Sequence, residues 1–151
     1  MKFIIAIISL LAIEGCMGRK NVNLFTPPDV VFEKTACFGT CPEFMLEVFP
    51  VGSTYLTVRN NMPLDSGKYL CLTCNPQDLK IVLKKAKKIK FKELKDKYDP
   101  GFMDLPSTMT RIEGKLVTNT MGAPAGLIEL EELIDSLYIQ NNEWQKLIEA
   151  K

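Results

Sequence analysis

Residues 44–59 read FMLEVFPVGSTYLTVR, and this stretch predicts a β-hairpin near the start of the fold. The segment PVGS at 50–53 is a typical turn sequence, and residues 54–59 are rich in the β-branched and aromatic side chains that favour strands. The first half alternates, so one side of its strand is apolar: Phe44, Leu46 and Val48. An antiparallel sheet is therefore expected at the centre of the protein.

Further strand-like segments flank this hairpin. Residues 29–34 (DVVFEK) and 68–73 (KYLCLT) are short runs rich in β-branched and aromatic residues. Residues 108–119 (TMTRIEGKLVTN) predict a second hairpin, with Glu113 and Gly114 as its tight turn. These segments extend the expected sheet on both sides of the first hairpin.

Helical periodicity appears after the strands. Asn75 and Pro76 form a good pair for the N-cap and first position of a helix. The apolar residues that follow share one helical face; they are Leu79, Val82, Leu83, Ala86 and Ile89. A second short helical piece is expected around Phe91 and Leu94, and residues 98–107 form a turn-rich connection. The stripe of a last helix comprises Leu127, Leu130, Ile134 and Leu137, and the tail with Trp144, Leu147 and Ile148 is expected to dock as one or two further turns.

The first residues, MKFIIAIISLLAIEGC, resemble the signal peptide of a bacterial lipoprotein. Lys2 gives a positive start, and residues 3–13 form an apolar run that is shorter than the roughly 20 residues needed to span a bilayer. Gly15 precedes Cys16 as in a lipobox, where the cysteine thiol receives a diacylglycerol and becomes the new N-terminus after cleavage. Glu14 departs from that pattern, which has a small or apolar residue there. An ordinary cleaved signal peptide and an uncleaved anchor are the alternatives.

The lipobox resemblance implies a cell-envelope protein that is held to the membrane through acyl chains, such as palmitate, on Cys16. Two or more acyl chains give stable anchoring, whereas one gives marginal binding. Met17 is not the aspartate that retains enterobacterial lipoproteins in the inner membrane. We therefore expect attachment to the outer membrane, with the protein facing the periplasm.

The order strands, helix, hairpin, helix predicts an α+β fold, a mostly antiparallel sheet with the helices packed on one face. The 151 residues are the length of one ordinary domain. We expect a signal peptide at 1–15, the lipidated cysteine and a tether at 16–28, and a single α+β domain at 29–151.

Composition excludes several classes of function. The chain has no histidine, so no Ser-His, Cys-His or His-metal mechanism operates within it. The formal net charge is +1, and no arginine or aromatic pattern points to nucleic acid. No constellation of catalytic residues is supported by the spacing, so we expect neither enzymatic activity nor a cofactor.

Residues 37–42 read CFGTCP, and this motif resembles a bacterial domain family of unknown function marked by Cys-Phe-Gly-Thr-Cys-Pro. Phe44 is similar to an aromatic residue that follows the motif in that family. Supporting similarities lie in Tyr98, Asp104 and Pro106, and in the helix from Pro124 through Asp135. The resemblance covers roughly residues 29–140 and agrees with export and lipid anchoring, which are frequent among members. It implies no activity, cofactor or catalytic residue.

Four cysteines remain once Cys16 is assigned to the lipid, and an even number in an oxidising compartment predicts disulfides. They are Cys37, Cys41, Cys71 and Cys74, which allow three pairings that the sequence leaves open. The resembling family contains only the first pair, which favours Cys37–Cys41 as a self-contained bridge.

Two alternatives use the same cysteines. All four thiolates, Cys37, Cys41, Cys71 and Cys74, have ligand types and spacings acceptable for a structural zinc site. Cys71 and Cys74 also form a Cys-x-x-Cys pair just before a helix start, where a reactive thiolate is favoured.

Residues 80–97 contain nine lysines against Glu93 and Asp96. This charge indicates either binding to anionic lipid headgroups or an acidic partner, or simply a solvated helix face. The leading hypothesis is a non-enzymatic binding or interaction module, anchored to the membrane, with a protein or envelope ligand as partner. The alternatives are a thiol–disulfide redox protein that uses Cys71 and Cys74, and a zinc-stabilised domain.

Overall fold

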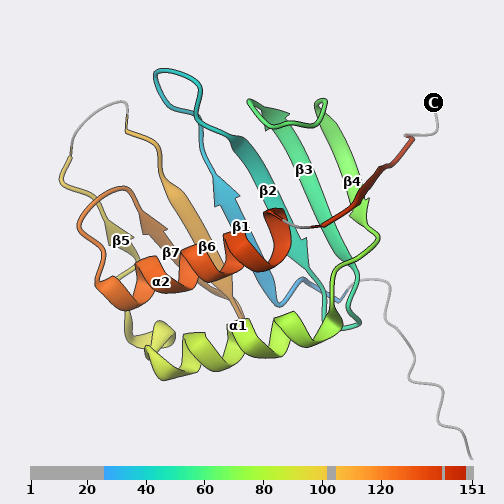
Figure 1. Cartoon of the computed structure of the whole chain (residues 1–151). Coiled ribbons are helices and arrows are strands. Elements are labelled where there is room, and N and C mark those ends of the chain that lie inside the picture. The colour runs from blue at the N-terminus through green and yellow to red at the C-terminus, as the bar shows by residue number, and fades with distance from the viewer. Residues whose placement is uncertain (1–25, 102–104, 141, 149–151) are drawn as a thin grey trace, which may run out of the picture.

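The computed structural model describes residues 26–101, 105–140 and 142–148. Within these residues the chain forms an eight-stranded sheet and two α-helices (Figure 1). The predicted signal peptide, Cys16, most of the predicted tether, and Asp104 lie outside the described residues. The expectation of an α+β fold with a mostly antiparallel sheet is confirmed.

The strands are β1 (Val30–Lys34), β2 (Glu43–Val48), β3 (Thr54–Asn60), β4 (Gly67–Cys71), β5 (Lys97–Tyr98), β6 (Thr108–Ile112), β7 (Lys115–Asn119) and β8 (Trp144–Lys146). The helices are α1 (Pro76–Lys88) and α2 (Ala125–Ile134), with a 3-10 turn η1 (Phe91–Glu93) after α1 and a π-helical turn η2 (Asp135–Ile139) after α2. The order across the sheet is β5-β7-β6-β1-β2-β3-β4-β8, and every neighbouring pair is antiparallel except β5 and β7.

The buried face of the sheet is organised around one row of residues that are directly opposite one another on six adjacent strands. Going from β7 to β4, the row is Val117, Thr110, Phe32, Leu46, Leu56 and Tyr69. All six are buried, the first five at 0% exposure. Because side chains alternate along a strand, this register places the residues two positions before and after each of these on the same face, among them the buried Val30, Phe44, Val48 and Val58.

The predicted hairpin of residues 44–59 is present as β2 and β3. Its turn is closed by hydrogen bonds from the Phe49 N–H to the Ser53 carbonyl and from the Gly52 N–H to the Phe49 carbonyl, both 2.9 Å. Gly52 has φ of +88° and lies against Pro76 at the start of α1, with 3.3 Å from an added Cβ to the proline ring. A side chain at residue 52 would therefore strain the backbone and crowd the helix start.

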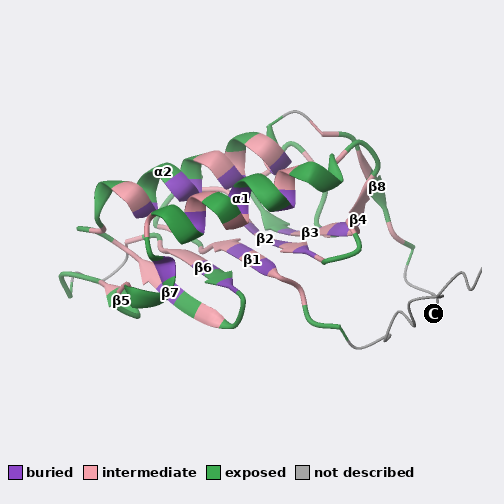
Figure 2. Cartoon of the chain, turned by 90° about the horizontal axis from the view of Figure 1, so that it is seen from below, coloured by how far each residue is buried: buried purple, intermediate pink, exposed green. Residues whose placement is uncertain are grey.

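Helix α1 begins where the sequence predicts. The Asn75 side chain accepts a hydrogen bond from the Gln77 N–H at 3.0 Å, and Pro76 occupies the first helical position. Of the predicted stripe, Leu79, Val82 and Ala86 are buried, which joins α1 to the core of the sheet (Figure 2).

Helix α2 runs beside α1 and contacts it closely. A Cβ added to Gly126 would lie 3.0 Å from the Ile89 side chain, and Lys85 forms an ion pair with Glu129. The stripe Leu127, Leu130 and Ile134 is fully buried, as predicted. The helices therefore approach each other where α2 has a small residue.

Two short edge strands were not predicted, and one prediction is wrong. The tail does not add helical turns: Trp144–Lys146 forms β8, which pairs with β4, while Ile148 is 95% exposed. At the start of the predicted turn-rich connection 98–107, the structure has a short strand that the sequence analysis did not include: Lys97–Tyr98 pairs in parallel with β7 as β5. In both cases the segment becomes a strand because the backbone of an existing strand provides its hydrogen-bond partners. The local sequence does not show this pairing.

The central row predicts a strong dependence of stability on Leu46. Leu46→Ala removes a fully buried side chain from β2, so we expect the free energy of unfolding to fall by about 2–5 kcal/mol. Leu116→Ala is the matched control, because Leu116 lies in β7 but is 37% exposed, and we expect a change within about 0.5 kcal/mol. Urea unfolding of both variants measures the difference, and equal losses would contradict the assigned buried face.

Candidate functional site

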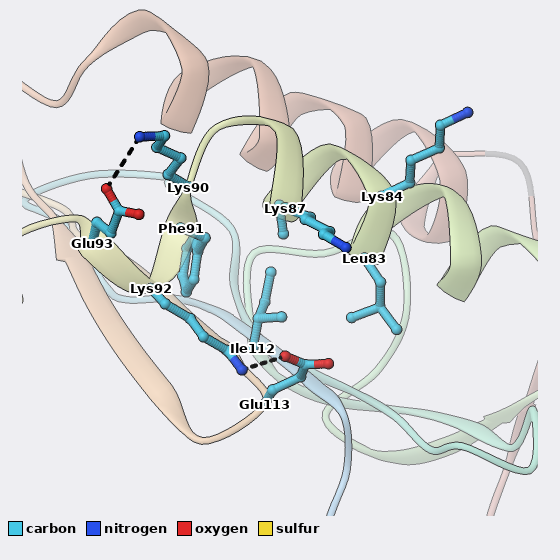
Figure 3. Close-up of a pocket in the computed structure, with 10 residues that line it drawn as sticks. Leu83, Lys84, Lys87, Lys90, Phe91, Lys92, Glu93, Ile112 and Glu113 are labelled. Carbon is cyan, nitrogen blue, oxygen red and sulfur yellow. Dashed lines mark ion pairs between the residues drawn. The ribbon is translucent and has the colours of Figure 1, made fainter.

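A pocket of about 750 Å³ opens between the C-terminal half of α1, η1 and the turn from β6 to β7 (Figure 3). This volume falls within the range of roughly 300–1,000 Å³ that is common for small-molecule sites. Its apolar lining comes from Leu83 and Ala86 on α1, Phe91 in η1 and Ile112 in β6. Three of these four also belong to the buried core, so the floor is held in place by the packing of the sheet.

Charged side chains surround the apolar floor. Four lysines and two glutamates line the pocket and give it a formal charge of +2; they are Lys84, Lys87, Lys90, Lys92, Glu93 and Glu113. Lys90 pairs with Glu93 at 3.6 Å, and Lys92 pairs with Glu113 at 2.7 Å. Among the described residues, Lys84 and Lys87 have no acidic partner within ion-pair distance. Lys87 lines the pocket, and Figure 3 shows its amino group ending close to Leu83 in this view, whereas Lys84 points away from the pocket.

The end of α1 forms one wall of the pocket. The Lys90 N–H donates to the Lys87 carbonyl at 3.1 Å, and Lys90 itself is left-handed, with φ of 55° and ψ of 48°. A glycine usually occupies this position after a helix, and another residue there costs on the order of 1 kcal/mol. The left-handed residue turns the chain so that Phe91 enters the core directly beneath the lysines.

The opposite wall is the predicted turn between β6 and β7. Glu113 and Gly114 have φ of 46° and 86°, as a tight two-residue hairpin requires, which confirms the predicted turn. The Glu113 N–H donates to the Asp29 carbonyl at 3.0 Å, and Ile112 lies opposite Val30. The pocket is therefore built at the end of the sheet where β1 begins.

The cysteines form two local disulfides. Cys37 and Cys41 are joined in the loop between β1 and β2, and Cys71 and Cys74 are joined between β4 and α1. Both pairs have Cα–Cα distances of 5.7 Å, within the usual range for a disulfide. The pairs fit a structural role, since each closes the connection between two packed elements.

The two disulfides lie at opposite ends of the sheet. Cys37 follows the end of β1 and Cys71 ends β4, and these strands run in opposite directions because three antiparallel pairings separate them. The structure therefore does not bring the four thiols together as the zinc alternative requires. Among the residues it describes, no group of three or more cysteine or acidic side chains is arranged to hold a metal ion.

A second polar cluster, separate from the pocket, lies under α2. Glu131 is buried, accepts a hydrogen bond from the Asn119 amide at 2.7 Å, and lies 3.4 Å from the Thr110 hydroxyl. Lys34 is nearby and pairs with Asp135 at 3.2 Å. Burial raises the pKa of the Glu131 carboxyl from 4.5 to about 7, although both hydrogen bonds and the Lys34 charge act to lower it.

Sequence reasoning noticed the lysine run but missed most of the rest. Ile112 and Glu113 join the pocket through the pairing of β6 with β1, a long-range contact that no local pattern reveals. Glu131 had a usable signal, because it lies four residues after Leu127 and three before Ile134, on the buried stripe of α2.

Comparison with known proteins identifies a family. The profile of a domain of unknown function, DUF6438, matches residues 28–138. The chain belongs to this family. The predicted kinship with a family of unknown function over roughly residues 29–140 is thus confirmed at that level. No curated protein and no solved structure matches the chain.

The DUF6438 match contains both disulfides and the whole pocket. Within the part of the chain that the structure describes, no helix is long and apolar enough to cross a membrane. Cys16 precedes both the match and the described residues, so its predicted lipidation remains a prediction.

Glu131→Gln tests the buried carboxyl through the pH dependence of stability. The folded protein keeps the Glu131 proton up to about pH 7, whereas the unfolded chain releases it near pH 4.5. The stability that the protonated carboxyl contributes is therefore fully present below pH 4.5 and is lost as the pH rises to 7. We expect the wild type to lose on the order of 3 kcal/mol relative to Glu131→Gln over that interval.

Urea unfolding at pH 4.5 and pH 8 measures this difference. Glu132→Gln is the control, because it changes an exposed neighbour on the same helix and leaves Glu131 in place, so its stability should fall between the two pH values as that of the wild type does. A wild type and a Glu131→Gln variant whose stability difference is the same at both pH values would contradict the raised pKa.

The disulfides predict a specific pattern of thiol labelling. Alkylation of the unreduced protein should leave Cys37, Cys41, Cys71 and Cys74 unmodified, and all four should react after full reduction under denaturing conditions. Closing loops this small stabilises by about 2 kcal/mol each in the chain-entropy model. Intact mass spectrometry reads the number of blocked thiols, and labelling of any of the four before reduction contradicts the pairing.

Proposed function

We propose that this DUF6438 protein is a lipid-anchored protein of the bacterial cell envelope whose domain is a non-enzymatic binding module. The observation that carries the binding role is the pocket between α1, η1 and the β6–β7 turn, with its apolar floor and lysine rim. A preformed concavity with an apolar floor and polar groups that can fix the orientation of a bound molecule is the usual form of a ligand site.

The anchor is supported by the sequence of the N-terminus. An apolar run ends at Gly15-Cys16, which fits attachment of acyl chains to Cys16 and an outer-membrane location facing the periplasm. Two disulfides agree with that compartment, because they persist in oxidising surroundings.

Binding rather than catalysis is supported by the chemistry of the available groups. The chain has no histidine, and the lining of the pocket offers lysines, glutamates and apolar side chains. Glu131, whose pKa is raised towards 7, is buried under α2 and hydrogen-bonded to the sheet rather than exposed in the pocket. We assign no catalytic residue and no cofactor.

We also propose that both helices cover the same face of the sheet, a packing that the views in Figures 1 and 2 support. In that arrangement the apolar stripe of α1 faces the strands and its lysines face outward. The pocket then opens beside a positively charged helix surface, which agrees with an anionic ligand or partner.

A thiol–disulfide redox role is the second candidate. Cys74 immediately precedes the α1 N-cap, and its backbone N–H donates to the Cys71 sulfur at 3.0 Å. Both features stabilise a thiolate at Cys71. Under this alternative Cys71–Cys74 opens in a glutathione buffer that leaves Cys37–Cys41 closed, whereas two structural bridges both stay closed.

Site-specific photo-crosslinking in cells tests the proposed function on the full chain. An aliphatic diazirine amino acid replaces Leu83, which lines the pocket, or Ile128, which is exposed on α2 outside it. We expect a discrete adduct from position 83 and none from position 128, because a bound ligand places its atoms against the pocket floor. The same cells expressing Cys16→Ser should lose the protein from the membrane fraction.

Each arm has its own contradicting result. Equal crosslinking at positions 83 and 128, or none at either, would remove the binding role of the pocket. A Cys16→Ser chain that stays in the membrane fraction as the wild type does would remove the lipid anchor at that residue.

A further inference from the structure

We propose that the lysine-rimmed pocket binds an anionic amphiphile, namely the negatively charged headgroup of one membrane lipid together with the start of its acyl chain. This inference rests on the proposed binding function and names the ligand class of the same site.

The lining accounts for the two halves of such a ligand. Leu83, Phe91 and Ile112 provide carbon surface from three different elements, which suits an acyl chain or another apolar body. The stems of the surrounding lysines add further apolar surface while their amino groups remain at the rim. A free inorganic anion would leave this floor without a partner.

The charge distribution selects the sign of the headgroup. The two acids at the rim, Glu93 and Glu113, are already paired with Lys90 and Lys92. Lys87 lines the pocket with its amino group near Leu83 and, within the described residues, has no acidic partner (Figure 3). A lysine in that position donates to a phosphate or carboxylate in a charge-assisted hydrogen bond, which is stronger than a neutral one.

The position of the pocket makes a membrane lipid the natural source of this chemistry. Glu113 at the rim hydrogen-bonds through its N–H to Asp29, and Pro27 and Pro28 share a neighbouring hollow with Glu113. The pocket thus lies at the end of the sheet where the chain arrives from Cys16. Asp29 lies thirteen positions after Cys16, and thirteen residue steps reach at most about 45 Å.

Tethering strengthens the binding of a lipid in the same membrane. A site confined within a few nanometres of the bilayer meets headgroups at a high effective concentration, so weak individual affinity suffices for occupancy. The wider lysine run on the exposed surface of α1, which includes Lys80 and Lys84, adds attraction to an anionic leaflet.

The test uses a fragment of residues 26–151, which contains both disulfides and the whole buried core between Val30 and Tyr138. NMR titration of the labelled fragment compares octyl phosphate below its micelle concentration with octyl glucoside, inorganic phosphate and a hexaglutamate peptide. We expect octyl phosphate to shift residues 83–93 and 112–113 and to bind at least about tenfold more tightly than the other three probes.

Matched lysine variants locate the headgroup. Lys87→Gln should weaken octyl phosphate binding about tenfold, since it removes a charge-assisted contact in the pocket. Lys80→Gln removes the same charge from the same helix outside the pocket and should change the affinity less than about twofold. Flotation of the fragment with vesicles of phosphatidylglycerol, but not of phosphatidylcholine, identifies a membrane lipid as the source.

The contradicting outcomes separate this inference from the proposed function. Octyl glucoside binding as tightly as octyl phosphate would overturn the anionic headgroup, and inorganic phosphate binding equally would overturn the acyl chain. Tighter binding of hexaglutamate would replace the lipid with an acidic peptide. If no probe binds while the crosslink from position 83 persists in cells, the lipid class is wrong and the binding module stands. If the crosslink is absent as well, both the lipid inference and the proposed binding function of the pocket are wrong.

Discussion

The rest of the structure depends on the antiparallel register that aligns Phe32, Leu46 and Leu56 across β1, β2 and β3. All three side chains are fully buried, and each strand repeats the same alternation on either side of this row. A slip of one residue in either pairing would turn an apolar side to water, so the register is strongly specified. The buried residues of α1 and α2 belong to the same core cluster as these strand residues.

The placement of the pocket follows from how α1 ends over that core. The buried face of α1 consists of Leu79, Val82 and Ala86. Its lysines therefore point away from the core or along the surface. After α1, the left-handed conformation of Lys90 turns the chain so that Phe91 is buried in the core. Strand β6 pairs with β1, which is distant in sequence. This pairing places the turn at Glu113 opposite the end of α1. Two of the three non-glycine residues with positive φ in the described chain, Lys90 and Glu113, therefore line the same cavity.

Local patterns predicted the parts of the fold that local physics controls. The alternation in residues 44–59 predicted β2 and β3, Asn75-Pro76 predicted the start of α1, and Glu113-Gly114 predicted the second hairpin. Short segments that become strands only by pairing with an existing edge were missed, because two or three residues carry too little pattern. Trp144 illustrates the point: its apolar character indicated docking, but the free edge of β4 decided that it docks as a strand.

The candidate site, too, was predictable only in part from the sequence. The four cysteines and the lysine run are visible in the sequence, but which thiols pair and which lysines meet an apolar floor depend on contacts between distant elements. The sequence left three cysteine pairings open, and the opposite directions of β1 and β4 are what separate Cys37–Cys41 from Cys71–Cys74. Glu131 lies on the apolar stripe of α2, so its burial could have been read from the spacing, but its hydrogen-bond partners Thr110 and Asn119 come from β6 and β7 and are not visible in the local sequence.

The measurement that tests the central claim most directly is native mass spectrometry of the full-length protein extracted from the membranes of cells that express it. We expect one non-covalently bound lipid with an acidic headgroup per chain, present in the wild type and in Lys80→Gln and depleted in Lys87→Gln. A chain that carries no lipid, or a neutral lipid that Lys87→Gln leaves unchanged, would contradict the assignment of the pocket.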